Sequence, residues 1–192
     1  MIRIDLPADE ATIRKLKVGD EIELYGTVVT ARDAAHKFMV ENWPEFVRPL
    51  IEGGAIYHCG PVMKKRGAKW TVVAAGPTTS IREEPYEAAV MEHYGVRLII
   101  GKGGMADKTL AACKKVGAVY LHAVGGAAVS LADSVKRVRE VHMLDELGVP
   151  EAFWVCEVEG FRGVVTMDSK GRSLHKKILG KSKKALNALL NL

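Results

Sequence analysis

The stretch 83-EEPYEAAVMEHYGVRLIIGKGGMADKTLAACKKVGAVYLHAV-124 indicates the fold class of this 192-residue chain. Two short apolar runs, 97-RLIIG-101 and 118-AVYLHAV-124, each follow a segment whose apolar residues recur with helical spacing. Short apolar strands that alternate with amphipathic helices are typical of a parallel sheet buried on both faces. The stretch therefore predicts an α/β fold in which helices flank a central sheet.

The residues on either side extend this prediction to the whole chain. Before the stretch we expect a β-rich N-terminal part, with strands over 2–6, 20–30, 55–62 and 69–75 and helices over 9–16 and 31–42. After it we expect a helix over 130–148, strands over 152–161 and 162–168, a turn at 168–171 and an amphipathic helix over 180–192. No internal repeat or low-complexity linker is visible, so we interpret residues 1–192 as a single domain.

Composition narrows the cellular setting and the cofactors. No run approaches the ~18 continuous apolar residues of a membrane span, and the start MIRIDLPADE lacks the layout of a signal peptide, so we expect a cytoplasmic protein. The cysteines are odd in number and widely spaced, at positions 59, 113 and 156. We interpret them as buried apolar residues of a reducing compartment, and expect no metal or cofactor bound by this chain alone.

The net charge of +5 allows an anionic partner without identifying it. Two basic clusters, 64-KKRGAK-69 and 176-KKILGKSKK-184, lack the interleaved aromatic residues of a platform for single-stranded nucleic acid. We interpret both clusters as solvated surface, and expect no nucleic-acid partner.

The segment 76-GPTTSIREEPYE-87 places three hydroxyls between a predicted strand and a predicted helix. Ser80 with Glu83 three residues later fits a capping box, in which a hydroxyl and a carboxylate satisfy free N–H groups of the first helical turn. Thr78 and Thr79 are not needed for that cap. Because a helix N-terminus favours an anion, the segment predicts an anion-binding site.

Three other glycine-rich or charged segments follow predicted strands. In 101-GKGGM-105 the glycines allow close approach of the backbone and Lys102 supplies a point charge, although a tight turn with an exposed lysine is the favoured interpretation of this segment alone. In 125-GGAA-128 close packing of strand on helix competes with a ligand role. In 30-TARDAAH-36 Asp33 could cap a helix, and we interpret His36 as a core histidine.

Arg32, Arg82 and Lys102 together are what recognition of a small dicarboxylate requires, because arginine binds a carboxylate through two hydrogen bonds. The sequence offers no obvious strong base, metal site or paired nucleophile beside these cations. The chain therefore looks like half of an active site.

Five motifs taken in order and spacing closely resemble the β subunit of class I, iron–sulfur-dependent fumarate hydratases and L(+)-tartrate dehydratases, over roughly Arg14 to Leu179. They are 30-TARDAAH-36, 57-YHCGPV-62, 76-GPTTSIR-82, 101-GKGGM-105 and 123-AVGGAA-128. The resemblance implies a swivelling β/β/α domain. It also implies an active site shared with an α subunit, or with the N-terminal domain of a fused chain, that holds a [4Fe–4S] cluster through three cysteines.

The resemblance also assigns roles and a reaction. It implies reversible trans addition of water to fumarate, giving (S)-malate, a step of the tricarboxylic acid cycle. Thr78 matches the catalytic base of the family, Arg32 and Arg82 match its carboxylate-binding arginines, and Lys102 matches its substrate-binding lysine. Phe38 departs from the pattern, since many relatives are expected to carry a basic residue there.

Several alternatives stay open at this point. L(+)-tartrate and mesaconate differ from malate and fumarate by a hydroxyl or a methyl group, which a few pocket residues decide. A non-catalytic module that binds an anion or nucleic acid, and a purely structural subunit, are the other classes. The expected assembly is a heterotetramer with the α subunit or a homodimer of the β chain.

Overall fold

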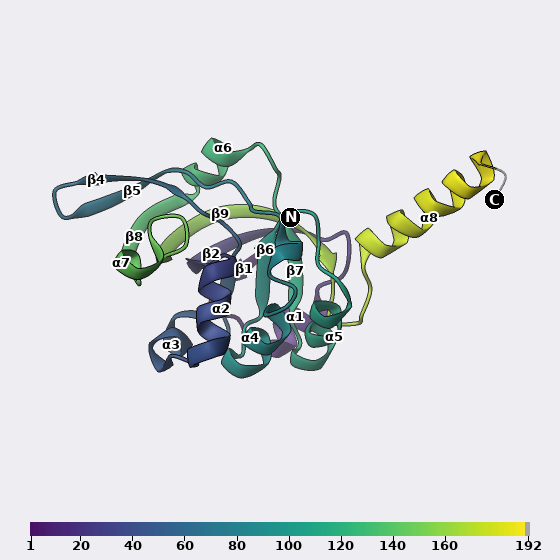
Figure 1. The fold of residues 1–192 in the computed structure, drawn as a ribbon, viewed down its shortest axis with the longest axis horizontal. Coiled ribbons are helices and arrows are strands. Elements are labelled where there is room, and N and C mark those ends of the chain that lie inside the picture. Colours follow the sequence, from purple (N-terminus) through teal and green to yellow (C-terminus); the bar gives the residue numbers. More distant parts are fainter. Residues whose placement is uncertain (191–192) are drawn as a thin grey trace.

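A seven-stranded sheet forms the centre of the computed structural model, which describes residues 1–190 (Figure 1). Its strand order is β1-β2-β3-β6-β7-β9-β8, and β2 also pairs with β9, so that β2, β3, β6, β7 and β9 close into a barrel. The strands are β1 (Ile2–Asp5), β2 (Glu21–Thr30), β3 (Ala55–Tyr57), β6 (Leu98–Gly101), β7 (Val119–His122), β8 (Val135–His142) and β9 (Phe153–Met167).

Strands β1, β2, β3, β6 and β7 run parallel, and the central ones are buried on both faces. Ile56, Ile99 and Tyr120 point outward into a core cluster formed with the helices, whereas their chain neighbours line the barrel interior. This alternation explains the nearly continuous apolar runs in the sequence. The predicted α/β fold, with helices flanking a central sheet, is confirmed.

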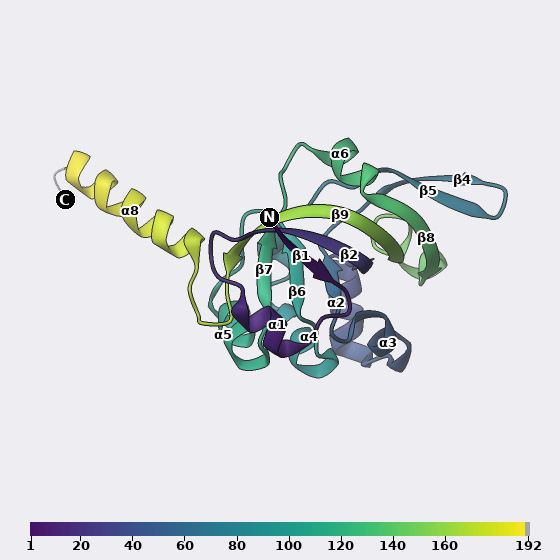
Figure 2. The ribbon, with the colours of Figure 1, turned by 180° about the vertical axis from the view of Figure 1, so that it is seen from behind.

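Helices cover the outer face of these parallel strands (Figures 1 and 2). They are α1 (Glu10–Lys15), α2 (Asp33–Asn42), α3 (Arg48–Ile51), α4 (Glu87–Tyr94) and α5 (Asp107–Val116), with a short 3-10 helix η1 (Glu45–Val47) before α3. Met39 of α2, Met91 of α4 and Cys113 of α5 are fully buried in the same cluster. Ile13 of α1 packs instead with the residues of the barrel interior. The buried residues of α2 and α4 hold these two helices against the sheet.

The strand predicted over 55–62 is wrong at its end. β3 stops at Tyr57, and β4 (Val62–Arg66) pairs with β5 (Lys69–Ala74) in a separate two-stranded sheet that projects from the body (Figure 1). Gly60 and Pro61 interrupt the pattern, because proline cannot donate to a sheet ladder. The basic cluster 64–69 is therefore mostly strand, with its turn at Gly67 and Ala68.

The helix predicted over 130–148 is also wrong. The segment forms α6 (Ala128–Asp133), strand β8 and α7 (Leu144–Leu147). β8 pairs antiparallel with β9, and the register shifts twice along it. Each shift adds a residue to one strand, so Val135, Val138 and Val141, three apart, all pack against the cluster around Trp154. Apolar residues spaced three apart are typical of a helix, and here the bulges produce the same spacing on one face of a strand.

The C-terminal part differs in its boundaries. The two strands predicted over 152–168 form one continuous strand, β9, and Gly160 forms a bulge opposite β2. A turn does form at the predicted hairpin 168–171, where the Gly171 N–H donates to the Asp168 carbonyl at 3.0 Å, but a single bridge between Met167 and Ser173 follows it in place of a second strand. Helix α8 (Leu174–Leu189) begins earlier than predicted, and residues 191–192 of that prediction lie outside the described residues.

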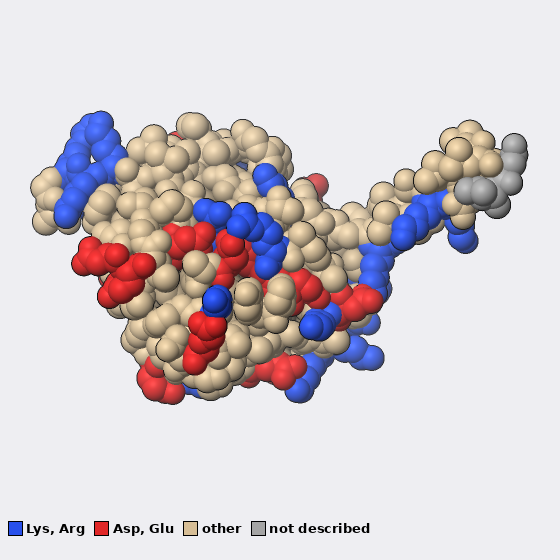
Figure 3. All heavy atoms as spheres, in the orientation of Figure 1, with Lys and Arg blue, Asp and Glu red and all other residues tan. Residues whose placement is uncertain are grey.

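Helix α8 projects from the body, and none of its described residues is buried (Figures 1 and 2). On the face shown in Figure 3, lysine and arginine side chains gather on the β4–β5 hairpin and along α8. Within residues 1–190, no helix combines the length and apolarity that crossing a membrane requires.

Candidate active site

The carboxyl ends of the parallel strands β2, β3, β6 and β7 lie together at one end of the barrel, which we call the edge. In α/β sheets, ligands bind at the carboxyl ends of parallel strands. Arg32 follows β2, Lys102 follows β6, and the loop that carries Thr78 and Arg82 lies between the ends of β3 and β6. The structure thus brings all four predicted site residues to the same edge.

The loop of residues 77–80 is wedged into the sheet where β3 and β6 separate. The Thr78 N–H donates to the His58 carbonyl at 2.6 Å, the Lys102 N–H to the Thr78 carbonyl at 3.2 Å and the Ser80 N–H to the Lys102 carbonyl at 3.0 Å. Pro77 and Thr79 form bridges with Cys59 and Lys102. These contacts give the loop strand-like support, and they place the half-buried Thr78 beside Lys102.

The predicted capping box of Ser80 and Glu83 is wrong. Ser80 is fully buried, and its hydroxyl contacts His58 and Tyr120 instead of a helix N-terminus. Residues 80–82 form a single 3-10 turn, η2, and α4 begins only at Glu87, since a residue before Pro85 disfavours helical geometry. The helix N-terminus expected beside Thr78 is therefore not there, and the cations available to an anion at this loop are side chains.

Asp33 links the two arginines. Its carboxylate accepts a hydrogen bond from Arg82 at 2.5 Å and lies 3.9 Å from the Arg32 guanidinium, which also pairs with Glu151 at 3.3 Å. Partial burial would raise the pKa of Asp33, but hydrogen bonds from its own backbone N–H and from Arg82 outweigh burial and lower it. Asp33 therefore acts as an anion between two cations, and no side-chain cap bond forms at the start of α2.

Glycines make room around these cations. A Cβ added to Gly60 would lie 2.7 Å from Nη1 of Arg32, and one added to Gly125 would lie 3.5 Å from Cδ of Lys102. The 125–128 turn thus lies beside Lys102. Gly103 and Gly104 have φ values of +81° and +79°, so the 101–105 segment is a tight turn that requires glycine for its backbone.

A buried polar cluster beneath the edge was missed from the sequence. His36, His58 and Glu87 are all fully buried, and both imidazole Nε2 atoms contact Oε2 of Glu87, at 3.1 and 2.8 Å. They are the one group in residues 1–190 that gathers three imidazole, thiol or carboxylate ligands, yet their separations are those of hydrogen bonds. His36 was correctly predicted to be a core residue.

The signal for this cluster was present in α4. Glu87 shares a helix face with Val90, Met91 and Tyr94, all fully buried. A carboxylate on an apolar helix face is almost never buried without a partner. A buried Glu87 therefore predicts a cation or a hydrogen-bond donor on a neighbouring element, and His36 and His58 are those partners.

The cysteines do not fit an iron–sulfur cluster in the described part of the chain. Cys59, Cys113 and Cys156 are all buried, and burial raises the pKa of each thiol, which disfavours the thiolate that ligates iron. No group of three potential ligands found within residues 1–190 contains a cysteine.

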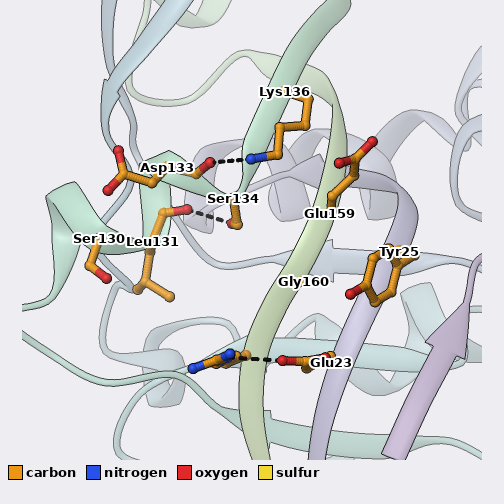
Figure 4. Close-up of a pocket in the computed structure, with 10 residues that line it drawn as sticks. Glu23, Tyr25, Ser130, Leu131, Asp133, Ser134, Lys136, Glu159 and Gly160 are labelled. Carbon is orange, nitrogen blue, oxygen red and sulfur yellow. Dashed lines mark hydrogen bonds and ion pairs between the residues drawn. The ribbon is translucent and has the colours of Figure 1, made fainter.

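The hollow drawn in Figure 4 lies elsewhere, with a volume of about 370 Å³. It is lined by residues of β2, β9 and the α6–β8 segment, among them Glu23 and Arg162, which form an ion pair at 3.0 Å. None of the four predicted site residues lines it. The candidate site is instead an open edge of the sheet.

Comparison with known proteins identifies the family. The model of the fumarase C-terminus matches residues 1–178. A Geobacillus stearothermophilus protein named as a fumarate hydratase class I is 49% identical over 180 residues, which are 93% of this chain and 34% of that protein. The chain thus spans about a third of that relative.

Two further relatives have nearly the size of this chain. A protein named as an L(+)-tartrate dehydratase subunit beta from Methanocaldococcus jannaschii is 43% identical, over 94% of each chain. The L(+)-tartrate dehydratase subunit beta of Escherichia coli strain K12 is 41% identical, over 88% of this chain and 83% of its own. With the match across residues 1–178, these similarities show that the chain belongs to the fumarase C-terminus family, which includes class I fumarate hydratases and the β subunits of L(+)-tartrate dehydratases.

Proposed function

We propose that this chain is the β subunit of a [4Fe–4S]-dependent hydro-lyase, a fumarate hydratase, that adds water reversibly to fumarate to give (S)-malate in the cytoplasm. The observation that carries the proposal is the position of Arg32 and Arg82 on either side of the Asp33 carboxylate. Two guanidinium groups that converge on one carboxylate are suited to receive the carboxylates of a substrate.

In this proposal Arg32, Arg82 and Lys102 bind the dicarboxylate. Removal of the proton at C3 of malate builds negative charge on the adjacent carboxylate. Cations around that carboxylate stabilise the transition state more than the ground state, which is the condition for catalysis. Arg82 is 52% exposed in the chain by itself, so a partner surface would strengthen these contacts by excluding water.

Thr78 is the proposed proton acceptor at C3. A threonine hydroxyl is a weak base, because its alkoxide does not persist near neutral pH without stabilisation. The available stabilisation comes from Lys102, whose backbone pairs with the Thr78 loop, and from Arg82 four residues along the chain. The roles of Thr79 and of the 125–128 turn are limited in this proposal to shaping the loop and the surroundings of Lys102.

The other half of the site is assigned to an α subunit that holds the [4Fe–4S] cluster. Two relatives of similar length carry the words "subunit beta" in their names, and the Geobacillus relative is about three times as long as the matched segment. Both facts agree with a partner, separate or fused, that completes the open edge. We propose a heterotetramer of two α and two β chains as the assembly.

L(+)-tartrate dehydratase is the second candidate function. It is supported by the length of this chain, which agrees with that of the two relatives named as β subunits of that enzyme. The relative named as a fumarate hydratase is much longer, and the match covers 34% of it. Tartrate carries one more hydroxyl than malate, so the choice depends on pocket residues that include those of the partner.

Reconstitution with a cluster-loaded α subunit in anaerobic buffer tests both candidates. Turnover of fumarate, L(+)-tartrate and mesaconate is measured with the same complex. We expect the largest kcat/KM for fumarate. A larger value for L(+)-tartrate would replace the first candidate by the second, and the absence of turnover of all three would overturn the proposed function.

A further inference from the structure

A continuous chain of buried hydrogen bonds runs from the core to the Thr78 loop. The Tyr120 hydroxyl donates to Oγ of Ser80 at 2.9 Å, Oγ of Ser80 lies 2.9 Å from Nδ1 of His58, and Nε2 of His58 lies 2.8 Å from the Glu87 carboxylate. All four side chains are fully buried. None of them was assigned a role in the proposed chemistry.

The directions of these bonds are mutually consistent. Because Ser80 accepts from Tyr120, its own proton is free to go to Nδ1 of His58, and His58 then donates from Nε2 to Glu87. Each hydrogen bond of this series thus joins one donor to one acceptor. A change at one position leaves unpaired polar atoms in a fully buried place.

A second histidine ties the same carboxylate to Arg32. Nδ1 of His36 lies 2.7 Å from the Arg32 carbonyl, and its Nε2 lies 3.1 Å from Glu87. Burial alone would lower the pKa of His36, but the Glu87 carboxylate outweighs burial and raises it; the pKa of Glu87 is in turn lowered to about 2 against the effect of burial. The pair thus favours an ionised Glu87 and a protonated His36.

The sheet itself is adapted to this chain of bonds. A Cβ added to Gly101 would overlap Oγ of Ser80 and would approach the Tyr120 hydroxyl to 3.1 Å and Nδ1 of His58 to 3.2 Å. Gly101 does not have a positive φ, so space explains the glycine better than backbone conformation does. The last residue of β6 thus lacks a side chain where the Ser80 hydroxyl enters.

Burying an ionic and polar cluster costs desolvation free energy, and apolar residues of similar volume are often at least as stabilising. This cluster contacts both segments that carry the proposed site: His58 through its carbonyl to Thr78, and His36 to the carbonyl of Arg32. Its members therefore define the position of one segment relative to the other.

We propose that the chain Tyr120–Ser80–His58–Glu87, with His36, is a clasp that fixes the Thr78 loop against Arg32, so that Ser80 and His58 are positioning residues of the active site. The inference rests on the proposed function for its kinetic consequence, but its structural consequence does not. A misplacement of about 1 Å at a reacting group can lower the rate on the order of 100-fold, so loss of the clasp affects kcat more than substrate binding.

The first test is hydrogen exchange in the isolated chain with Ser80→Ala. We expect the amide protons of positions 78, 80 and 102 to exchange at least tenfold faster than in the wild type, while the amides of α5 keep their rates. Ser169→Ala is the matched control, because Ser169 is another buried serine, whose hydroxyl has no partner among the described residues. Unchanged exchange at the loop in Ser80→Ala would overturn the clasp.

The second test is kinetic, in the complex with the α subunit. Ser80→Ala is expected to lower kcat at least tenfold while KM changes less than about threefold, and Ser169→Ala to leave both within twofold. A Ser80→Ala complex with a lower melting temperature and wild-type kcat would show a purely structural role and overturn the proposal.

Tyr120→Phe covers the case in which Ser80→Ala does not fold. It removes one donor and keeps the ring that packs in the core, so we expect faster exchange at the same three amides and a smaller loss of kcat. Wild-type exchange and kcat in this variant would overturn the clasp. A wild-type complex that turns over no dicarboxylate would overturn the proposed function alone, since the exchange measurements do not depend on it.

Discussion

The open edge and the buried network beneath it use the same kinds of side chain in opposite ways. At the edge, Arg82 is 52% exposed and shares Asp33 with Arg32, so its charge is available to a ligand. In the network, His36, His58 and Glu87 are inaccessible, and both imidazoles pair with the Glu87 carboxylate. The charges proposed to act on a substrate are incompletely paired, whereas those proposed to hold the geometry are paired and buried. Variants of the first region should therefore change activity, and variants of the second should change stability as well.

The largest expected effect comes from leaving the edge open. Without the α subunit the isolated chain should show no hydratase activity and bind no stoichiometric iron, because its cysteines are buried with raised pKa values and its cations form one wall only. Anaerobic reconstitution followed by iron and sulfide analysis of the chain checks this. A stoichiometric cluster on the isolated chain would contradict this prediction, because the edge would then be a complete site and not one wall of a shared site.

Thr78→Ala should have the next largest effect. If Thr78 accepts the C3 proton, kcat of the complex should fall by ~100-fold or more, the usual size of a general-base contribution. Its melting temperature should stay the same, because no side-chain cap bond is lost at the 3-10 turn that follows. Thr78→Ser keeps the hydroxyl and should retain measurable activity. A Thr78→Ala complex within threefold of wild type would place the base in the partner or in a bound water.

Alanine at Arg32, Arg82 or Lys102 should lower kcat/KM of the complex at least tenfold. Truncating one partner of a buried charge pair costs on the order of 2–5 kcal/mol, or roughly 30-fold to several-thousand-fold, once the partner subunit has closed the edge. Melting temperatures should barely move. Wild-type kinetics for any two of the three variants would contradict a shared carboxylate site.

The edge could be predicted from the sequence far better than the network could. Arg32, Arg82 and Lys102 stand in short glycine- or hydroxyl-containing segments after strands, and the parallel topology brings such segments together. The clasp depends instead on which side chains meet across β3, β7 and α4, and local patterns do not contain that information. Ser80 illustrates the difference, because its spacing from Glu83 fits a cap and only tertiary contacts reveal its partners.

The same distinction explains the error over residues 130–148. The three-residue spacing of Val135, Val138 and Val141 is a local signal, and by itself it favours a helix. Two bulges against β9 turn that spacing into one face of a strand, and they arise only when the partner strand is present. The central sheet escaped this ambiguity because its strands are short, apolar and separated by helices with clear glycine ends.

The network should reveal itself through the pH dependence of stability. The pKa of His36 is raised above its usual 6.5, so its stabilisation is complete below pH 6.5 and is lost as pH rises through the raised value. The pKa of Glu87 is lowered to about 2, so its stabilisation is complete above pH 4.5 and is lost as pH falls toward 2. The pair should therefore contribute fully between pH 4.5 and 6.5.

Above pH 6.5 the free energy of unfolding should decline by up to about 1.4 kcal/mol per pH unit. Urea titrations from pH 5 to 9 measure it. Glu83 also faces His36 and His58, and its pKa is raised by burial, so its own decline begins near pH 4.5 and is removed in Glu83→Gln. His36→Gln should abolish the decline above pH 6.5; a slope unchanged in that variant would mean that the pair does not ionise as described.

The smallest effect is expected from cations that belong to neither region. Lys64, Lys65 and Lys69 are exposed on the β4–β5 hairpin, which projects from the body with only its inner face packed near Trp154 (Figures 1 and 3). If they are solvated surface, replacing all three by glutamine should leave kcat/KM of the complex within about twofold and the melting temperature within a few degrees.

The variant also lowers the net charge by three, so it controls for general electrostatic attraction of a dianion, which added salt would screen. Kinetics at saturating α subunit separate weakened assembly from weakened catalysis. A tenfold loss that persists at saturation would mean that charge anywhere on the chain serves the substrate, and the contrast between a dedicated edge and the rest of the surface would fail.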